Sequence, residues 1–471
     1  MSFFKKISIL FLILLLFFIS FSIYRIHGAK IRIYNYNVKS DYNYDLNSST
    51  KVFNVQFSNN NLIIPDIEKG SFDTAILEIN IQSDLLGNLI EPYIDMKSSK
   101  LDLKEYFEYG AKGKRYLNIS KFINKDDKKI HLISKFCSIE KSQNKLYLFK
   151  NKDIEKTKIL LISPHPDDSE IAAYGLYSDN SMESYILTVT AGDAGKFKYD
   201  EIYSKKKEHF LQKAKLRIWN SITVPMLGGI DTQHSFNLGY FDGTLHKLYF
   251  NKDKIIKSLF TDLDSTNYYR NLNFNSVKDE LGNSKSKWSN LVNDIEFFLK
   301  KVKPKIIVAP YPAIDSHPDH KFTTIATLEA MKRLDMKDVQ LLLYTNHHKE
   351  SEGYPFGEMH SVVPLPPIVK EPIYFNSILS YPLSMEKQSQ KIFALESMND
   401  LRLDTEWLDA TGNMKNSIKS ARKQLSSYDL SYFRRAIRSN ELFFVINSKE
   451  IFNNNIQSKI IGDIDYLNSK K

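Results

Sequence analysis

Residues 158–170 of the chain read KILLISPHPDDSE, an apolar run followed by a turn rich in proline, histidine and aspartate. A short continuous apolar run is typical of a strand that is buried on both faces, as in a parallel sheet. Runs of the same kind recur as YILTVT (185–190), KIIVAP (305–310) and QLLLY (340–344). Helically spaced apolar residues separate them, for example over 288–299 and 322–334. This alternation predicts an α/β fold with a doubly wound, mostly parallel sheet.

The chain continues this pattern beyond the last of these strands. A proline-rich loop, VVPLPP, is followed by a predicted helix over 385–398, further helices, and a late strand, ELFFVI, at 441–446. We therefore expect the α/β domain to occupy residues 151–450, with a C-terminal tail at 451–471.

The segment from residue 30 to 150 has a different pattern, made of short alternating runs. These runs are KVFNVQF (51–57), TAILEINIQ (74–82) and KLYLFK (145–150). Turn-forming clusters such as SNNN at 58–61 separate them, which predicts a small β-sandwich domain over residues 30–150. Such modules often bind carbohydrate, but the same pattern fits a domain that only positions its neighbour.

The N-terminus carries an uninterrupted apolar run. Lys5 and Lys6 precede ISILFLILLLFFISFSIY (7–24), which has no charge and no proline. About 18 residues are just enough for one membrane span. We expect residues 1–29 to form a signal anchor that leaves the rest of the chain exported, on the periplasmic or extracellular face. Cleavage as a signal peptide is the alternative, with its only small residues near HGAK at 27–30.

Composition excludes some classes of function. The chain has 471 residues, 42% hydrophobic and 25% charged, which is ordinary for a folded protein of more than one domain. Its net charge is +10, yet no basic run with interleaved aromatics resembles a nucleic-acid platform. Cys137 is the only cysteine, so no intrachain disulfide can form. We expect no nucleic-acid partner.

Two short segments carry residues suited to metal chemistry. PHPDD (164–168) directly follows the first parallel strand, and SHPDH (316–320) follows KIIVAP. Ligands of open α/β sheets bind at the carboxyl ends of the strands, where both segments fall. Histidine and carboxylate are good zinc ligands. Of the adjacent Asp167 and Asp168, one can bind a metal while the other faces a bound water, as metal-assisted hydrolysis requires.

These residues resemble a known family, the LmbE-like or PIG-L deacetylases. The resemblance rests on PHPDDSE (164–170), TAGDAG (190–195), LGYFDG (238–243) and HPDH (317–320), in the order of the family. It covers residues 155–345, with a weaker echo at SQKIFALESM (389–398). The family includes N-acetylglucosaminyl-phosphatidylinositol de-N-acetylases and bacterial enzymes acting on N-acetylglucosamine conjugates. The resemblance implies its Rossmann-like fold.

Carried over residue by residue, the resemblance also implies roles for individual side chains. His165, Asp168 and His320 would bind zinc, although ligand type alone also admits Fe2+. Asp167 would be the general base, and His317 would stabilise the oxyanion or protonate the leaving amine. The remaining roles implied are orientation of His317 by Asp319 and substrate binding by Asp242 and Lys205. Lys205 stands where the family often has an arginine, which a lysine cannot replace in a bidentate contact.

The predicted function is therefore a zinc-dependent hydrolase that removes an N-acetyl group from an N-acetylated sugar. The expected partner is a surface polysaccharide or a glycolipid, met at the membrane that holds the N-terminus. Two alternatives stay open: an amidase acting on a small amino-sugar conjugate, and a non-catalytic glycan-binding protein on the same scaffold. The sequence also leaves open whether His234, His246, His347, His348 and His360 reach the site. The oligomeric state is not predicted.

Overall fold

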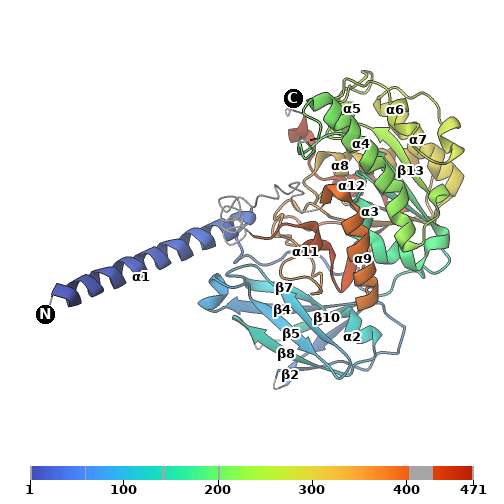
Figure 1. Cartoon of the computed structure of the whole chain (residues 1–471). Coiled ribbons are helices and arrows are strands. Elements are labelled where there is room, and N and C mark those ends of the chain that lie inside the picture. The colour runs from blue at the N-terminus through green and yellow to red at the C-terminus, as the bar shows by residue number, and fades with distance from the viewer. Residues whose placement is uncertain (1–2, 59, 141–143, 200–201, 402–427, 469–471) are drawn as a thin grey trace.

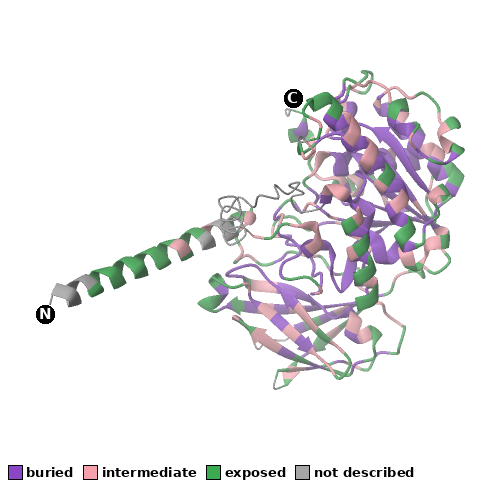
Figure 2. Cartoon of the chain, viewed as in Figure 1, coloured by how far each residue is buried: buried purple, intermediate pink, exposed green. Residues whose placement is uncertain are grey.

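The computed structural model describes residues 3–58, 60–140, 144–199, 202–401 and 428–468. Its N-terminal helix, α1 (Phe3–Lys30), projects away from the body of the molecule (Figure 1). Within α1, Ser8–Arg25 has a mean hydropathy of 2.2 and is not buried at all (Figure 2). By length and composition this segment can cross a membrane, a property that it shares with signal sequences.

The β-rich part (residues 51–149) consists of two antiparallel sheets. One has the order β1-β10-β4-β7, with β9 also paired to β4, and the other β2-β3-β8-β5-β6. The bounds of the first are β1 Lys51–Val55, β10 Asn144–Phe149, β4 Thr74–Ser83, β7 Lys112–Asn118 and β9 Cys137–Ile139. Those of the second are β2 Phe57–Ser58, β3 Asn61–Ile63, β8 Lys129–Lys135, β5 Tyr93–Lys97 and β6 Asp102–Tyr106. Alternate residues of both sheets, such as Leu77 and Ile94, meet in one hydrophobic core.

The α/β part (residues 159–461) is built on a seven-stranded mixed sheet with the order β13-β12-β11-β14-β15-β17-β16. Its strands are β11 Ile159–Ser163, β12 Ser184–Thr190, β13 Ser235–Tyr240, β14 Ile306–Pro310, β15 Gln340–Tyr344, β16 Ser377–Pro382 and β17 Asn440–Asn447. The five strands from β13 to β15 are parallel, whereas β17 runs antiparallel to β15 and to β16. The strand order reverses between β11 and β14, because the chain builds outward to both sides from this pair.

Helices cover both faces of this sheet. Leu160 and Ile162 of β11 pack in one core with α7 (Trp288–Val302) and α8 (Pro318–Arg333). Ile159 and Leu161 face the other way, toward α3 (Asp168–Asp179) and α9 (Met385–Ser397). The side chains of β11 alternate between two buried faces, which explains why the strand is apolar from Ile159 to Ile162. The remaining α-helices of the described residues are α2 Ser120–Asn124, α4 Lys206–Thr223, α5 Leu245–Phe250, α6 Asn267–Arg270, α11 Tyr432–Ala436 and α12 Asn454–Ile461.

Several predicted elements need correction. The run at 51–57 is not one strand, because β1 ends at Val55 and β2 begins at Phe57 in the other sheet. The late strand is confirmed as β17, but it is antiparallel, so the sheet is mixed. The helix predicted over 322–334 begins earlier, at Pro318. Part of the predicted helical stretch after Met398 falls on residues 402–427, outside the described residues.

A segment that we call the strap (residues 31–46) joins α1 to both parts. On the β-rich side, Arg115 donates to the Val38 carbonyl oxygen (2.6 Å). On the α/β side, the Asn35 N–H donates to the Glu350 carbonyl oxygen (2.8 Å). The strap therefore ties the end of α1 to the loop that follows β15.

The two parts also contact one another directly. The Asn118 side chain of β7 donates to the Val363 carbonyl oxygen (3.1 Å) and to Ser380 Oγ of β16 (2.9 Å). Ser380 in turn donates its N–H to Thr74 Oγ1 of β4 (2.9 Å). Strand β16 is thus the element through which the mixed sheet meets the β-rich part.

Candidate metal centre and active site

Two turns at the carboxyl ends of the paired strands β11 and β14 carry the candidate ligands. After β11, the Asp168 carboxylate accepts the His165 N–H (2.9 Å) and α3 begins at Asp168. After β14, α8 begins at Pro318, a proline position that costs the helix no hydrogen bond. His317 is the N-cap of α8, and its Nδ1 accepts the Asp319 N–H (3.2 Å). The point where the strand order reverses therefore brings the two turns together.

Three donor atoms lie at nearly equal distances from one another. Asp168 Oδ2 is 3.2 Å from His165 Nδ1 and 3.3 Å from His320 Nε2, and the two ring nitrogens are 3.3 Å apart. Bonds of about 2.0–2.1 Å to a tetrahedral zinc place its ligand atoms about 3.3–3.4 Å apart. The trio His165, Asp168 and His320 therefore fits one small divalent cation.

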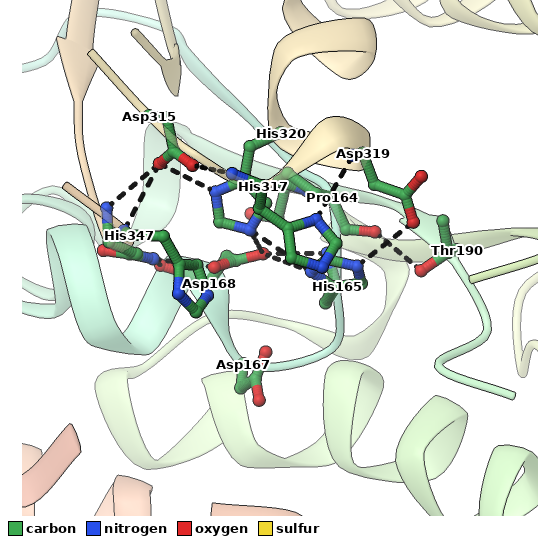
Figure 3. Close-up of polar contacts among 12 residues, drawn as sticks. Pro164, His165, Asp167, Asp168, Thr190, Asp315, His317, Asp319, His320 and His347 are labelled. Atoms are coloured by element: carbon green, nitrogen blue, oxygen red, sulfur yellow. Dashed lines mark hydrogen bonds and ion pairs between the residues drawn. The ribbon is translucent and has the colours of Figure 1, made fainter. Parts of the chain in front are cut away.

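The far side of each imidazole is held by a carboxylate. His320 Nδ1 lies 3.0 Å from Asp315 Oδ2. His165 Nε2 lies 3.3 Å from Asp242 Oδ1 and 3.4 Å from Asp319 Oδ2. Such partners hold a metal-binding histidine in one tautomer and one orientation. Figure 3 shows Asp315 beside the His320 ring and Asp319 beside the His165 ring.

Burial and charge shape the titration of these groups. Burial acts to raise the pKa of Asp168, but His320 and His165 outweigh it and hold this pKa well below its ordinary value. Burial acts to lower the pKa of His165, but the carboxylates of Asp242, Asp168 and Asp319 raise it well above its ordinary value. For His317, burial and the neighbouring His165 and His320 lower the pKa to about 4. The centre thus pairs ionised carboxylates with imidazoles in a buried site.

His317 and His347 lie on one side of the trio. The His317 ring centroid is 4.7 Å from that of His165 and 5.0 Å from that of His320. One ring nitrogen each of His165, His317 and His320 also form a group within 4.8 Å of one another. The ring centroids of His347 and His317 are 5.5 Å apart. His347 Nε2 also shares a hydrogen bond with the Tyr432 hydroxyl (2.8 Å). His317 is close enough to a cation at the trio to act on the same substrate atom.

Asp167 lies apart from the histidine network and contacts α4 instead (Figure 3). Its Oδ2 accepts a bond from Arg217 Nη2 (2.9 Å). Arg217 Nη1 also lies 3.6 Å from Asp400 Oδ2 and 3.9 Å from Asp242 Oδ2. Burial raises the pKa of Asp167, and the Arg217 guanidinium opposes that rise. One buried arginine therefore faces three carboxylates at this site.

The TAGDAG and LGYFDG segments position these groups. Gly192 has φ +67°, and a Cβ there would lie 2.7 Å from the Arg217 guanidinium. Asp193 accepts the Asp242 N–H (2.8 Å) and the Ser258 hydroxyl (2.6 Å). The first segment thus makes room for the arginine and fixes the backbone that carries Asp242.

The structure places the other predicted site residues differently. The Asp319 carboxylate accepts the N–H groups of Gly243 (2.6 Å) and Leu245 (3.1 Å), so it is Asp319's backbone, and not its carboxylate, that bonds His317. Lys205 is exposed just before α4, and within the described residues no hydrogen bond or ion pair joins it to the site. The cation that α4 brings to the site is Arg217.

The histidines left open by the sequence separate into two groups. His347 lies in the site, whereas His348 is buried behind it with its ring 5.4 Å from Tyr354. His360 bonds Gln388 (2.8 Å), and His234 stacks on Tyr185. His246 is buried on α5.

Sequence reasoning missed Arg217, Asp315 and Asn346. His209, Lys213 and Arg217 recur every fourth residue and are all buried on α4, so charge on the inner face of a helix was the available signal. Asp315 precedes His317 by two residues and Asn346 donates to Asp168 Oδ1 (2.7 Å), but neither belongs to a quoted motif. Their role follows only from the tertiary contacts.

Residues 160–331 match the PIG-L family model, described as GlcNAc-PI de-N-acetylase. The match confirms the resemblance over the segment that carries both metal-ligand turns. It ends before the loop of His347 and does not include the β-rich part.

Comparison with other proteins adds weaker likenesses. A search of curated proteins gave no match. A deacetylase of teicoplanin biosynthesis, solved as a bog complex, is 17% identical with a TM-score of 0.34, covering 62% of this chain and 98% of that one. A conserved protein of Thermus thermophilus, TT1542, is 16% identical with a TM-score of 0.30, covering 62% and 94%. The family match over residues 160–331 is the stronger link to known proteins.

Proposed function

We propose that this chain is a metal-dependent hydrolase that removes the acetyl group from an N-acetylated sugar, a GlcNAc-type unit of a surface polysaccharide or a glycolipid. The observation that carries the proposal is the spacing of three donor atoms, on His165, Asp168 and His320, within 3.3 Å of one another. The match of the same segment to the PIG-L family model supports the choice of reaction.

His165, Asp168 and His320 would hold the cation, zinc or another divalent metal such as Fe2+. When bound, it supplies a Lewis acid that polarises the acetamide carbonyl and lowers the pKa of water. Asp315 and Asp242 keep the two rings aimed at it through His320 Nδ1 and His165 Nε2.

Asp167 is the group that we assign as general base. It is next to the ligand Asp168 in the chain, and its Oδ2 is held by Arg217 at 2.9 Å. Its other oxygen is available to accept the proton of the attacking water. Arg217 aims this carboxylate and favours its ionised form against the effect of burial, a role that the sequence analysis assigned to no residue.

His317 is the group that we assign to the oxyanion. Because its Nδ1 accepts the Asp319 N–H, the proton of the neutral ring lies on Nε2. From there it can hydrogen-bond the developing oxyanion. As the C–N bond breaks, the amine nitrogen takes the proton that Asp167 accepted from the attacking water. The products are acetate and a free amino sugar.

The domain organisation that we propose follows the sequence. Residues 1–29 form a membrane anchor, 30–150 a β-sandwich domain, 151–450 a doubly wound deacetylase domain and 451–471 a tail. The β-sandwich domain is supported by two sheets that share one hydrophobic core. The doubly wound domain is supported by helices that cover both faces of a sheet with five parallel strands. With α1 retained as a span, the catalytic domain works at the outer surface of the membrane.

The test is acetate release by the full chain from N-acetylglucosamine oligosaccharides and from a glycolipid with the same terminal sugar. Each is measured after chelation and again after adding back zinc or iron(II). The proposal predicts that chelation abolishes acetate release and that adding back zinc or iron(II) restores it. If the chain bound one metal ion but released no acetate from any N-acetylated sugar, the proposed reaction would be wrong. If acetate release survived chelation, the proposed metal dependence would be wrong.

A further inference from the structure

A loop of the β-rich part exposes four large apolar side chains. It is the connection from β4 to β5, residues 84–91, and contains a short 3-10 turn at Leu86–Asn88. The exposed fractions are 84% for Leu85, 51% for Leu86, 43% for Leu89 and 47% for Ile90. Single exposed leucines are ordinary, but four within six residues form a patch that marks a binding surface.

The loop is held in shape by its own polar groups. Asp84 accepts the Gly87 N–H (2.8 Å) and donates its N–H to the Phe136 carbonyl oxygen (3.1 Å). The Ile90 N–H donates to the Leu86 carbonyl oxygen (2.8 Å). A Cβ at Gly87 would clash with the Phe136 carbonyl, so the loop packs closely on β8 and β9. The apolar side chains are therefore presented outward by an ordered turn.

The loop lies beside the place where α1 joins the body. The Gly110 N–H donates to the Gly87 carbonyl oxygen (2.8 Å), and the neighbouring Tyr109 N–H donates to the Tyr34 hydroxyl (3.1 Å). Tyr34 is only four residues beyond the end of α1 at Lys30. Glu91, at the other end of the loop, is in the same cluster through Tyr428, whose ring lies 6.4 Å from that of Tyr109. In Figure 1, α1 meets the body next to the β-rich part.

Exposed basic residues lie on the chain segments next to this loop. They are Arg32 and Lys39 of the strap, Lys112 at the start of β7 and Lys135 at the end of β8. The loop itself has two acidic residues: the Asp84 carboxylate accepts the Gly87 N–H, and the Glu91 carboxylate accepts the Tyr428 hydroxyl. An apolar tip within a basic surround is the arrangement of segments that enter the headgroup layer of a membrane with anionic lipids.

We propose that the loop of residues 84–91 is a second membrane contact, with Leu85, Leu86, Leu89 and Ile90 entering the interfacial layer of the bilayer that α1 crosses. This rests on the proposal that α1 is retained as a span. A single helix joined through a short strap leaves the body free to tilt. A second contact on the β-rich part fixes that tilt, so the β-rich part orients the catalytic domain toward the membrane surface.

The test uses the full chain in vesicles of phosphatidylcholine with phosphatidylglycerol. A nitroxide spin label is placed on a Leu85→Cys variant and, as the matched control, on a Met182→Cys variant. Met182 is 80% exposed at the amino end of β12, away from the loop. Burial raises the pKa of Cys137 to about 12, so the native thiol stays unlabelled at neutral pH. The measurement is the accessibility of each label to oxygen, which partitions into lipid, and to a water-soluble nickel chelate.

The expected ratio of oxygen to nickel accessibility is several-fold higher at Leu85→Cys than at Met182→Cys. Equal ratios in chains that float with the vesicles would overturn the second contact while leaving the anchor in place. Chains that do not float would overturn the membrane placement as a whole. A Leu85→Cys label shielded from both reagents would indicate a protein partner or a second copy and would also overturn the proposal. Acetate release from a soluble oligosaccharide, measured on the same samples, reports the proposed reaction separately.

Discussion

At the scale of single residues, Arg217 has the most unusual surroundings of the site. Its guanidinium is buried and lies 2.9 Å from Asp167, 3.6 Å from Asp400 and 3.9 Å from Asp242. Removing one partner of a buried ion pair leaves an uncompensated charge and costs about 3–5 kcal/mol. Here the three carboxylates would also repel one another, and Asp167 would lose the bond that aims it.

We expect Arg217→Gln to lower both the free energy of unfolding and the turnover. Displacing a catalytic group by about 1 Å can lower turnover by about 10²-fold, and we expect a fall of that order with the metal still bound. The measurements are urea unfolding, metal content and acetate release. The matched control is Arg270→Gln, which breaks a buried pair with Asp294 (2.6 Å) on α6 and α7. This control should destabilise the fold similarly but leave the turnover of folded protein near that of the parent. If both variants lost turnover equally, Arg217 would contribute to the stability of the fold but not specifically to catalysis.

Substitution of Asp167 and of His320 should both lower turnover, but only substitution of His320 should lower the metal content. Asp167→Asn keeps the shape and the bond to Arg217 but cannot accept a proton, so we expect about 10²–10⁴-fold lower turnover with metal content unchanged. His320→Ala removes one of three donor atoms and should lose the metal and the turnover together. Metal content by mass spectrometry and acetate release distinguish the two. A fully active Asp167→Asn variant would show that the base is another group.

The part of this site that could be predicted from the sequence is the part carried by the two turns after β11 and β14. PHPDD and SHPDH are local, and a strand before each places them at one edge of the sheet, so the two turns could be grouped in advance. The choice of His165, Asp168 and His320 as ligands came from the resemblance to the PIG-L family. Arg217 and Asp315 could not be predicted, because both lie outside the quoted motifs, and Arg217 is 50 residues from its partner Asp167 along the chain. The orientation of Asp319 could not be predicted either, since it depends on the N–H groups of Gly243, the last residue of LGYFDG, and of Leu245, two residues further on.

At the scale of secondary structure, buried apolar runs predicted the strands well because both faces of each strand are covered. β11, β12, β14 and β15 match their predicted runs within one residue. β16 was missed, and SILSYP shows why: it carries polar residues that bond the β-rich part instead of a continuous apolar run. The change of sheet at Gln56 was missed because alternation continues through it unchanged.

Strand β6 carries a buried carboxyl group at the junction of the two parts. Burial raises the pKa of Glu105 to about 8, and the Asn118 N–H that it accepts (2.8 Å) opposes this only partly. The unfolded chain releases this proton near the ordinary pKa of 4.5, whereas the folded chain keeps it until about pH 8. The stability contributed by the protonated group is therefore complete below about pH 4.5 and is lost as the pH rises to about 8.

We expect Glu105→Gln to flatten the pH dependence of the free energy of unfolding. Between about pH 5 and 8 the parent should lose roughly 1.4 kcal/mol per pH unit more than the variant, because glutamine has no proton to release. Urea unfolding at several pH values measures the difference between the two slopes. Parallel curves across this range would contradict a buried neutral Glu105.

At the scale of the whole molecule, the strap limits how far the site can lie from the end of α1, the proposed membrane span. The Asn35 N–H donates to the Glu350 carbonyl oxygen, and Glu350 follows His347 by three residues. Asn35 is itself five residues beyond the end of α1. The contour length of these segments keeps His347 within about 35 Å of the end of α1. With α1 as the proposed span, a sugar held on a lipid would lie within reach of the side chains to which we assign catalysis.

This geometry makes a prediction about the substrate. A protein and a glycolipid that are held in one membrane meet at a higher effective concentration than a protein in solution and the same glycolipid. A chain that begins at Ile31 keeps the strap contacts of Asn35 and Tyr34 but lacks α1. We expect its kcat/KM to fall by about 10²-fold on an N-acetylated sugar displayed on vesicles, and to be unchanged on the free oligosaccharide. Acetate release from the two forms of the same sugar gives the comparison. A loss on both forms would mean that α1 supports the fold, and no loss on either would mean that the enzyme meets its substrate without an anchor.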